Sequence, residues 1–478
     1  MDKHDNLIGG EWVGADTYGE NRNPSNWDEV IGLYAQGSSA DAERAVEAAR
    51  AAAPGWAAAT PQARHDLLEA VGRKLAERSQ EIGRLLSREE GKTLAEGIGE
   101  TMRAAQVFKF FAGEALRLTG DMQASVRPDI DVEVTREPVG IVGLITPWNF
   151  PIAIPAWKTA PALAYGNCVI LKPADLTPGC AHVIARLLDE CGCPPGVFNL
   201  VMGRGSVVGE TIVTHPGVDA LSFTGSVGTG SHIAEVCGRL KRKCQLEMGG
   251  KNPMVVLNDA NLDVAVSVCL NGTFFSTGQR CTASSRLIVE DGIHDAFVER
   301  LVAGMRALRV GDALAPETQI GPVVDGKQLD SNLAYVDLAG KEGAEVIGGE
   351  RLELATNGFF QAPALFLGTN NSMRINREEI FGPCGSIIKV GSFDEAMAVA
   401  NDTEFGLSAG ICTTGLKSAR EFKRRSQAGM VMVNLPTAGV DFHVPFGGRK
   451  GSSYGPREQG RYAAEFYTTV KTAYVFAG

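Results

Sequence analysis

Residues Gly140-Ile-Val-Gly-Leu-Ile-Thr-Pro-Trp-Asn-Phe-Pro151 begin with a short apolar run and end in a loop that two prolines restrain. Four further apolar runs follow before residue 248, and segments with apolar residues at helical spacing separate them. The runs lie at 140–145, 168–171, 198–201, 220–223 and 244–246, with helices expected at 154–165, 178–191, 207–215 and 227–240. Short apolar runs that alternate with helices are typical of buried parallel strands in βαβ units. The sequence therefore predicts an α/β fold with a Rossmann-like, doubly wound parallel sheet.

Polar residues and glycines follow the expected strands where such sheets bind ligands, outside the carboxyl ends of the strands. Asn149 offers a side-chain amide after the first run, and Lys172 follows the second. Thr224-Gly-Ser-Val-Gly-Thr-Gly230 follows the fourth run and enters a helix, which indicates either a phosphate site or an ordinary tight turn. Glu247 ends the fifth run beside glycines that would let a substrate approach, although an isolated glutamate is most often a solvated surface charge.

A second stretch, Ser276-Thr-Gly-Gln-Arg-Cys-Thr282, places a cysteine behind a glycine turn after a helix expected at 264–275. Arg280 precedes Cys281, and a neighbouring positive charge favours the thiolate, which is the nucleophilic form of cysteine. The alternative is a small buried hydrophobic residue, which is the commoner role of an intracellular cysteine.

The remaining segments predict additional elements on both sides of this core. Helices are expected at 41–50, 61–87, 100–118, 288–310, 327–342, 394–401 and 417–427, and strands within 381–393 and at 466–475. The part of the chain after residue 248 therefore indicates a second α/β domain that carries Cys281. Residues 122–136 predict an exposed hairpin, which is either an interface between subunits or a flap that faces solvent.

Composition excludes several classes of protein. The 478 residues, 44% hydrophobic and 21% charged, are ordinary for a globular protein of two or three domains, and the net charge of −10 argues against a nucleic-acid surface. No apolar run approaches the roughly 18 to 20 residues that span a bilayer, and the N-terminus lacks the design of a signal peptide, so a cytoplasmic protein is expected. The ten cysteines and seven histidines show no spacing typical of a metal site or of a disulfide framework.

Seven motifs taken together resemble the aldehyde dehydrogenase superfamily, and they occur in that family's order over nearly the whole chain. They are Pro147-Trp-Asn-Phe-Pro151, Lys172, Thr224-Gly-Ser226, Glu247-Met-Gly-Gly-Lys251, Gly278-Gln-Arg-Cys281, Glu379-Ile-Phe-Gly-Pro383 and Pro445-Phe-Gly-Gly448. The resemblance implies a soluble enzyme that oxidises an aldehyde to a carboxylic acid with NAD(P). An inactive NAD(P)-binding relative is the alternative from another class, although this chain keeps the nucleophile, the base and the oxyanion donor.

By this resemblance, Cys281 adds to the aldehyde, and the Asn149 amide and the Cys281 N–H hold the oxyanion. Glu247 then activates the water that hydrolyses the thioester. Relatives that transfer the acyl group to coenzyme A tend to lack this glutamate, so the hydrolytic reaction is favoured.

The resemblance also implies the cofactor residues, which are Trp148, Lys172, Asp175, Gly225, Ser226, Glu379 and Phe381. An acid at the position of Asp175 repels a 2′-phosphate and favours NAD, although its side chain is one methylene shorter than the family's common glutamate. Arg204 could pair with such a phosphate, so NAD or NADP is predicted with a preference for NAD.

Family resemblance divides the chain into an NAD(P)-binding domain at 1–121 and 138–248 and a catalytic domain at 249–446. Residues 122–137 and 460–478 form a hairpin and a C-terminal strand that join subunits into a homo-oligomer, either a dimer or a tetramer.

For the substrate, Arg280 is predicted to pair with a carboxylate at the far end of a semialdehyde. Residues 275–285 and 447–460 resemble the α-ketoglutaric semialdehyde (2,5-dioxopentanoate) dehydrogenases. Succinate or glutarate semialdehyde and broad aromatic or aliphatic aldehydes remain alternatives, and Arg280 could instead orient its own loop.

Overall fold

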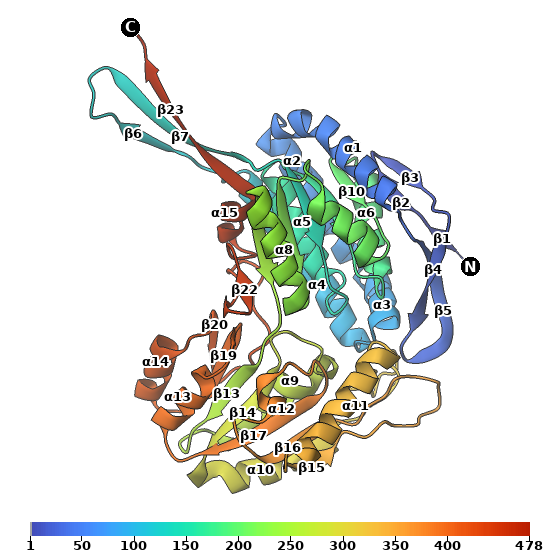
Figure 1. The fold of residues 1–478 in the computed structure, drawn as a ribbon, viewed down its shortest axis with the longest axis vertical. Helices are drawn as coiled ribbons and strands as arrows, with labels where there is room; N and C mark the ends of the chain where they lie inside the picture. The colour runs from blue at the N-terminus through green and yellow to red at the C-terminus, as the bar shows by residue number, and fades with distance from the viewer. Residues whose placement is uncertain (1) are drawn as a thin grey trace.

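The computed structural model describes residues 2–478, and two large sheets dominate it (Figure 1). The first sheet has eight strands in the order β22-β12-β11-β8-β9-β10-β2-β3. These strands are β22 (Ser453–Tyr454), β12 (Lys243–Glu247), β11 (Ala220–Thr224), β8 (Ile141–Ile145), β9 (Cys168–Lys172), β10 (Phe198–Leu200), β2 (Asn6–Ile8) and β3 (Glu11–Val13). The five strands from β8 to β12 are parallel, and the chain starts in the middle and winds outward in both directions. The predicted doubly wound sheet is confirmed.

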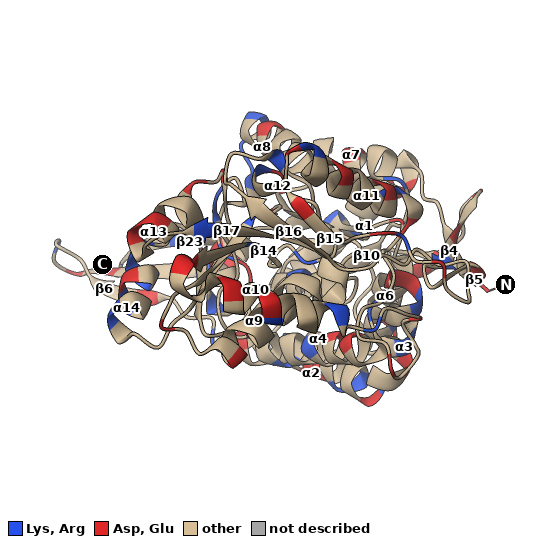
Figure 2. Cartoon of the chain, turned by 90° about the horizontal axis from the view of Figure 1, so that it is seen from below, with Lys and Arg blue, Asp and Glu red and all other residues tan. Residues whose placement is uncertain are grey.

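Helices cover both faces of this sheet. They are α1 (Ser39–Ala57), α2 (Pro61–Glu77), α3 (Ser79–Glu90), α4 (Leu94–Ala115), α5 (Ala153–Ala164), α6 (Pro178–Glu190), α7 (Glu210–Thr214) after the π-helical turn η1 (Gly205–Gly209), and α8 (Val227–Leu240). The edge-on view in Figure 2 places α1, α7 and α8 on one side and α2, α3 and α4 on the other. Helix α5 is buried along its whole length and belongs to the hydrophobic core formed by the first sheet and its helices.

The second sheet has seven strands in the order β15-β16-β17-β14-β13-β19-β20, and only β15 runs antiparallel to its neighbour. The strands are β15 (Glu345–Gly348), β16 (Ala364–Thr369), β17 (Cys384–Val390), β14 (Ser284–Glu290), β13 (Asn252–Val256), β19 (Ser408–Cys412) and β20 (Met430–Val433). Its helices are α9 (Leu262–Phe274), α10 (Asp291–Arg306), α11 (Gly326–Lys341), α12 (Arg374–Arg377), α13 (Phe393–Asn401) and α14 (Leu416–Arg425).

A three-stranded sheet extends away from the rest of the molecule (Figure 1). It pairs the hairpin of β6 (Asp121–Ala124) and β7 (Ile130–Pro138) with β23 (Thr468–Phe476), which follows η3 (Arg461–Ala463) and α15 (Ala464–Tyr467). The predicted hairpin and late strand are therefore confirmed as elements. Smaller sheets are formed by β1 (Lys3–His4), β5 (Asn26–Ala35) and β4 (Tyr18–Asn23), and by β18 (Phe405–Gly406) and β21 (Arg449–Lys450).

Two predicted helices were wrong in their extent. Residues 61–87 form two helices, because the backbone leaves the helical region at Arg78, with φ −100° and ψ 15°. The helix expected at 288–310 begins only at Asp291, because Leu287, Ile288 and Val289 are fully buried in strand β14. A short, continuously apolar run fits a buried strand as well as a buried helix, so spacing alone could not decide between them.

Within residues 2–478, no helix is both long and apolar enough to cross a membrane. The same residues contain no cluster of three or more His, Cys, Asp or Glu side chains that could hold a metal ion. Acidic and basic residues are interspersed over the helices in Figure 2.

Candidate active site

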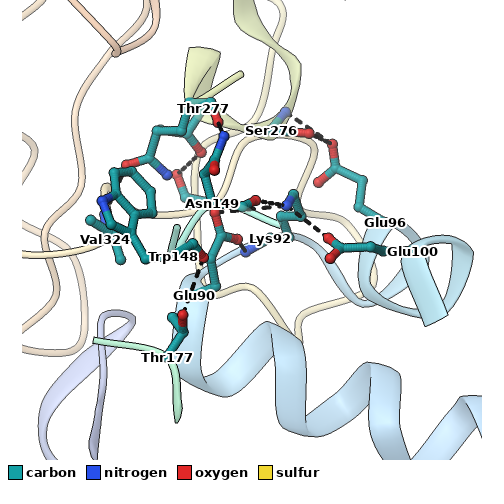
Figure 3. A network of polar contacts seen from close by, with 12 residues as sticks. Glu90, Lys92, Glu96, Glu100, Trp148, Asn149, Thr177, Ser276, Thr277 and Val324 are labelled. Atoms are coloured by element: carbon teal, nitrogen blue, oxygen red, sulfur yellow. Dashed lines mark hydrogen bonds and ion pairs between the residues drawn. The ribbon is translucent and has the colours of Figure 1, made fainter. Parts of the chain in front are cut away.

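The loop that presents Cys281 has an uncommon backbone between α9 and β14. Ser276, Thr277 and Gly278 all have positive φ, at 51°, 56° and 65°. A Cβ atom at Gly278 would lie 2.0 Å from the carbonyl oxygen of Gly382, so a side chain has no room there. Ser276 donates from its main-chain N and its Oγ to Glu96 Oε1, at 2.9 and 2.8 Å (Figure 3). These contacts fix the turn behind the cysteine.

Asn149 follows β8 and is tied directly to this loop. Its side-chain Nδ2 donates to the carbonyl oxygen of Gln279 at 3.0 Å. Its own carbonyl accepts a hydrogen bond from Lys92 Nζ, which also pairs with Glu100 Oε2 at 2.9 Å (Figure 3). The structure therefore brings Asn149 next to the residues that precede Cys281, and its role as oxyanion donor stays a prediction.

Glu247 is the last residue of β12 and is buried, and Ser453 Oγ donates to its Oε2 at 2.5 Å. Burial and the charge of Glu458 raise the pKa of Glu247 well above its usual range. Glu458 forms a buried ion pair with Lys158 and accepts a hydrogen bond from Trp157 Nε1 at 2.7 Å. A carboxylate with a raised pKa is a stronger base, which suits the activation of water.

Cys281 lies at the wall of a cavity of about 380 Å³, within the range of roughly 300–1,000 Å³ typical of small-molecule sites. Its carbonyl oxygen accepts a hydrogen bond from Asn252 Nδ2 at 2.8 Å, which anchors the residue on the second sheet. The apolar part of the cavity wall comprises Phe150, Ile154, Trp157, Phe275, Ala438, Val440 and Phe446.

Arg280 and the Cys281 thiolate attract each other, as expected, but the pKa of the thiol is raised rather than lowered. Burial raises the pKa of the Cys281 thiol, and the carboxylates of Glu379, Glu247 and Glu458 raise it further. The guanidinium of Arg280 instead donates to the carbonyl oxygen of Asn271 and, at 3.4 Å, to that of Gly272. Its Nε is buried without a partner. The arginine thus holds the end of α9, and the thiol needs a base to remove its proton.

The predicted cofactor residues follow strands of the first sheet, as expected. Lys172 Nζ, at the end of β9, donates to Asp175 Oδ1 at 3.0 Å. Ser226 Oγ accepts from the N–H of Thr229 at 3.4 Å and caps α8, and the Gly225 N–H donates to the Glu247 carbonyl at 3.0 Å. Arg204 is exposed at the start of η1.

Of the remaining cofactor residues, Glu379 and Phe381 come from the loop before β17, and Trp148 comes from the loop after β8. The Gly250 N–H donates to Glu379 Oε1 at 2.8 Å, and burial raises the pKa of Glu379 to about 7. The rings of Trp148 and Phe381 pack edge to face, with centroids 5.4 Å apart, and Phe381 has a φ of 62°.

The N-terminus of α8 has the chemistry that a pyrophosphate requires. Helix N-termini carry unpaired N–H groups and a partial positive charge. A Cβ at Gly228 would meet no atom within 4 Å, so the first turn faces open space. The hydroxyl of Thr224, just before this turn, is buried without a partner. These observations fit a dinucleotide.

Sequence reasoning missed the charged partners that position the site. Lys158 and Glu458 lie 300 residues apart, and the sequence assigned a role to neither of them. One signal was present, because Lys158 is the only charged residue in the apolar helix α5. Lys92, between α3 and α4, gave no such signal.

Comparisons with known proteins agree with this geometry. The model of the aldehyde dehydrogenase family matches residues 12–473. An alpha-ketoglutaric semialdehyde dehydrogenase of Bacillus subtilis is 44% identical over 98% of this chain and 97% of that protein. An alpha-ketoglutarate semialdehyde dehydrogenase of Haloferax volcanii is 43% identical over 99% of both chains. A crystal structure of betaine aldehyde dehydrogenase from Staphylococcus aureus in complex with NAD+ is 34% identical, covers 99% of this chain and 95% of that chain, and has a TM-score of 0.97.

The chain belongs to the aldehyde dehydrogenase family. The resemblance seen in its motifs, the fold class and the prediction of an aldehyde-oxidising enzyme are confirmed.

Proposed function

We propose that this enzyme oxidises a semialdehyde, preferentially α-ketoglutaric semialdehyde, to the acid, with NAD as the hydride acceptor. The observation that carries the proposal is the cavity beside Cys281. Asn149 is hydrogen-bonded to Gln279 in the Cys281 loop, and Glu247 is close enough for its charge to raise the pKa of Cys281. Three cationic and two anionic side chains line this cavity, so it favours an aldehyde that carries a negative charge. The names of the Bacillus and Haloferax relatives support the same substrate.

The chemical steps follow from the properties of the three side chains. Cys281 loses its thiol proton to solvent water, and the thiolate adds to the aldehyde carbon. The Asn149 amide and the Cys281 N–H stabilise the oxyanion of the thiohemiacetal. After hydride loss leaves a thioester on Cys281, Glu247 accepts a proton from water, the hydroxide attacks the acyl carbon, and the thiolate leaves. The product is a carboxylate.

NAD, when bound, supplies the nicotinamide that accepts the hydride. Its ribose and pyrophosphate groups would be held by Lys172, Asp175, Gly225, Ser226 and Glu379, with Trp148 and Phe381 beside the nicotinamide end. Asp175 already pairs with Lys172, and this carboxylate would repel a 2′-phosphate. The NAD+ complex of the Staphylococcus relative supports the same preference. Arg204 is the residue through which NADP would be favoured instead.

The proposed division of labour follows the two sheets. Residues 1–121 and 138–248 bind the cofactor, and 249–446 carry the nucleophile. Residues 122–137 and 460–478 join subunits into a dimer or tetramer.

Betaine aldehyde, the substrate named for the Staphylococcus relative, is the main rival, because the folds are so similar. It carries a positive charge, which the cationic excess of this cavity disfavours.

A panel of aldehydes with NAD and NADP tests the proposal. We expect the highest kcat/KM with α-ketoglutaric semialdehyde and NAD, and no turnover by a folded Cys281→Ala variant. Glu247→Gln should still be acylated but should deacylate slowly, so rapid mixing should give a burst near one NADH per site. A panel in which no aldehyde is oxidised would support the inactive relative. Full turnover without a burst would remove Glu247 from the role of base.

A further inference from the structure

The cavity beside Cys281 contains five charged side chains, and four of them are already occupied. Lys92 pairs with Glu100 at 2.9 Å and lies 3.7 Å from the ring centroid of Phe150. Glu96 accepts two hydrogen bonds from Ser276. As described above, Arg280 donates to main-chain carbonyls of α9. Lys92 and Glu100 neutralise each other, Glu96 is anionic, and the hydrogen bonds of the Arg280 guanidinium go to the main chain of α9.

Arg103, on the cavity-facing side of α4, differs from the other four. One Nη donates to Gln459 Oε1 at 3.0 Å, and the guanidinium carbon lies 5.9 Å from the ring centroid of Trp157. Like Arg280, Arg103 makes no ion pair within residues 2–478. The other guanidinium nitrogens of Arg103 are accessible, whereas Nε of Arg280 is completely buried. Burial lowers the pKa of Arg103, while the more distant Asp441 and Glu100 raise it by less.

We propose that Arg103 is the substrate-binding residue that pairs with the carboxylate at the far end of the semialdehyde. This inference rests on the proposed function and names the group that gives it its specificity.

The chemistry of the guanidinium supports this role. Its N–H groups form a planar fork that matches a carboxylate with two parallel hydrogen bonds. The neutral amide of Gln459 and the face of Trp157 hold the fork without neutralising its charge. A partly desolvated and unpaired cation gains most from a ligand that brings the missing negative charge. The Arg280 side chain, in this division of roles, positions the loop of Cys281.

Two aldehydes of equal chain length, one with a carboxylate and one without, distinguish a lost contact with the carboxylate from a general loss of enzyme activity. We would measure 2,5-dioxopentanoate and pentanal with the wild-type enzyme and with Arg103→Met, Arg103→Lys and Arg280→Met. Arg103→Met should raise KM for the acid about 10- to 100-fold, the size expected for a lost hydrogen bond between charged groups. Its kcat and its KM for pentanal should be nearly unchanged. Arg103→Lys should lose less, and Arg280→Met should lower kcat for both aldehydes alike.

Inhibition by glutarate, an unreactive dicarboxylate, provides a readout that is independent of turnover. We expect glutarate to compete with substrate in the wild type and to compete weakly in Arg103→Met. If that variant fails to fold, Arg103→Lys and Arg103→Gln carry the same comparison.

An equal rise in KM for both aldehydes, or a selective loss in Arg280→Met alone, would overturn the assignment of Arg103. Failure of the proposed function looks different, because wild-type enzyme would then show no preference for 2,5-dioxopentanoate over pentanal.

Discussion

Glu247 and Glu458 are two buried carboxylates whose charges interact at the active site. Glu458 is, after burial, the largest cause of the raised pKa of Glu247, whereas Lys158 and Arg457 lower that pKa. Because the base must be deprotonated to act, the rate of deacylation should rise as pH rises through the raised pKa of Glu247. The Lys158–Glu458 pair therefore tunes the base without touching the substrate.

Replacing Glu458 by Gln should lower the pKa of Glu247, because the repulsion is removed and the positive charge of Lys158 remains. The acid limb of kcat against pH should then move to lower pH, and the strength of the base should fall. Glu421→Gln, which removes a carboxylate from a surface ion pair on α14, serves as the control. An acid limb that stays in place, or one that moves to higher pH, would contradict this account of Glu247.

At the scale of elements, the short connection between α3 and α4 contacts the active-site loop through the side chain of Lys92. Gly91 begins it with a φ of 99°, and Lys92 then reaches Glu100 and the carbonyl of Asn149. Lys92→Met would leave the buried Glu100 without its counter-charge. Breaking a buried ion pair in this way costs about 3–5 kcal/mol, so the midpoint of thermal unfolding should fall clearly.

The same Lys92→Met variant should also lower kcat, because the Asn149 loop loses its anchor. Lys341→Met is a matched control, since its partner Asp337 is equally exposed and surface pairs contribute little. Both properties can be measured by calorimetry and steady-state kinetics on the same preparations. Unchanged stability would show that the Lys92 network does not hold the connection.

The positions of the site residues at the ends of strands were predictable from the sequence. The distant side chains that contact these residues were not. Lys172 and Glu247 end strands, Asn149 and Ser226 lie in the loops that follow strands, and chain direction alone places such residues on one edge of a parallel sheet. Glu458 reaches Lys158 across 300 residues, and no local pattern encodes a contact of that kind. The substrate residue shows the same limit, because Arg280 is conspicuous in the motif while Arg103 lies in an ordinary amphipathic helix.

At the scale of the whole molecule, the sheet of β6, β7 and β23 projects away from the remainder (Figure 1). Both of its outer strands have free edges, which readily pair with another chain. Large apolar side chains are also exposed on it, with Met122 77%, Val470 60%, Tyr474 61% and Phe476 66% accessible. Exposed apolar side chains gathered on one projecting element favour burial between subunits.

If this sheet joins subunits, the double variant Tyr474→Glu and Phe476→Glu should have a smaller mass in solution than the wild type. The reason is that burying two carboxylates in an apolar contact is strongly unfavourable unless they are paired. Light scattering after size-exclusion chromatography measures the mass directly. Leu416→Glu, at the exposed start of α14 and far from the sheet, is the control that should leave the mass unchanged. A wild-type enzyme that is already monomeric, or a double variant with the wild-type mass, would refute the assignment of 460–478 as part of the interface.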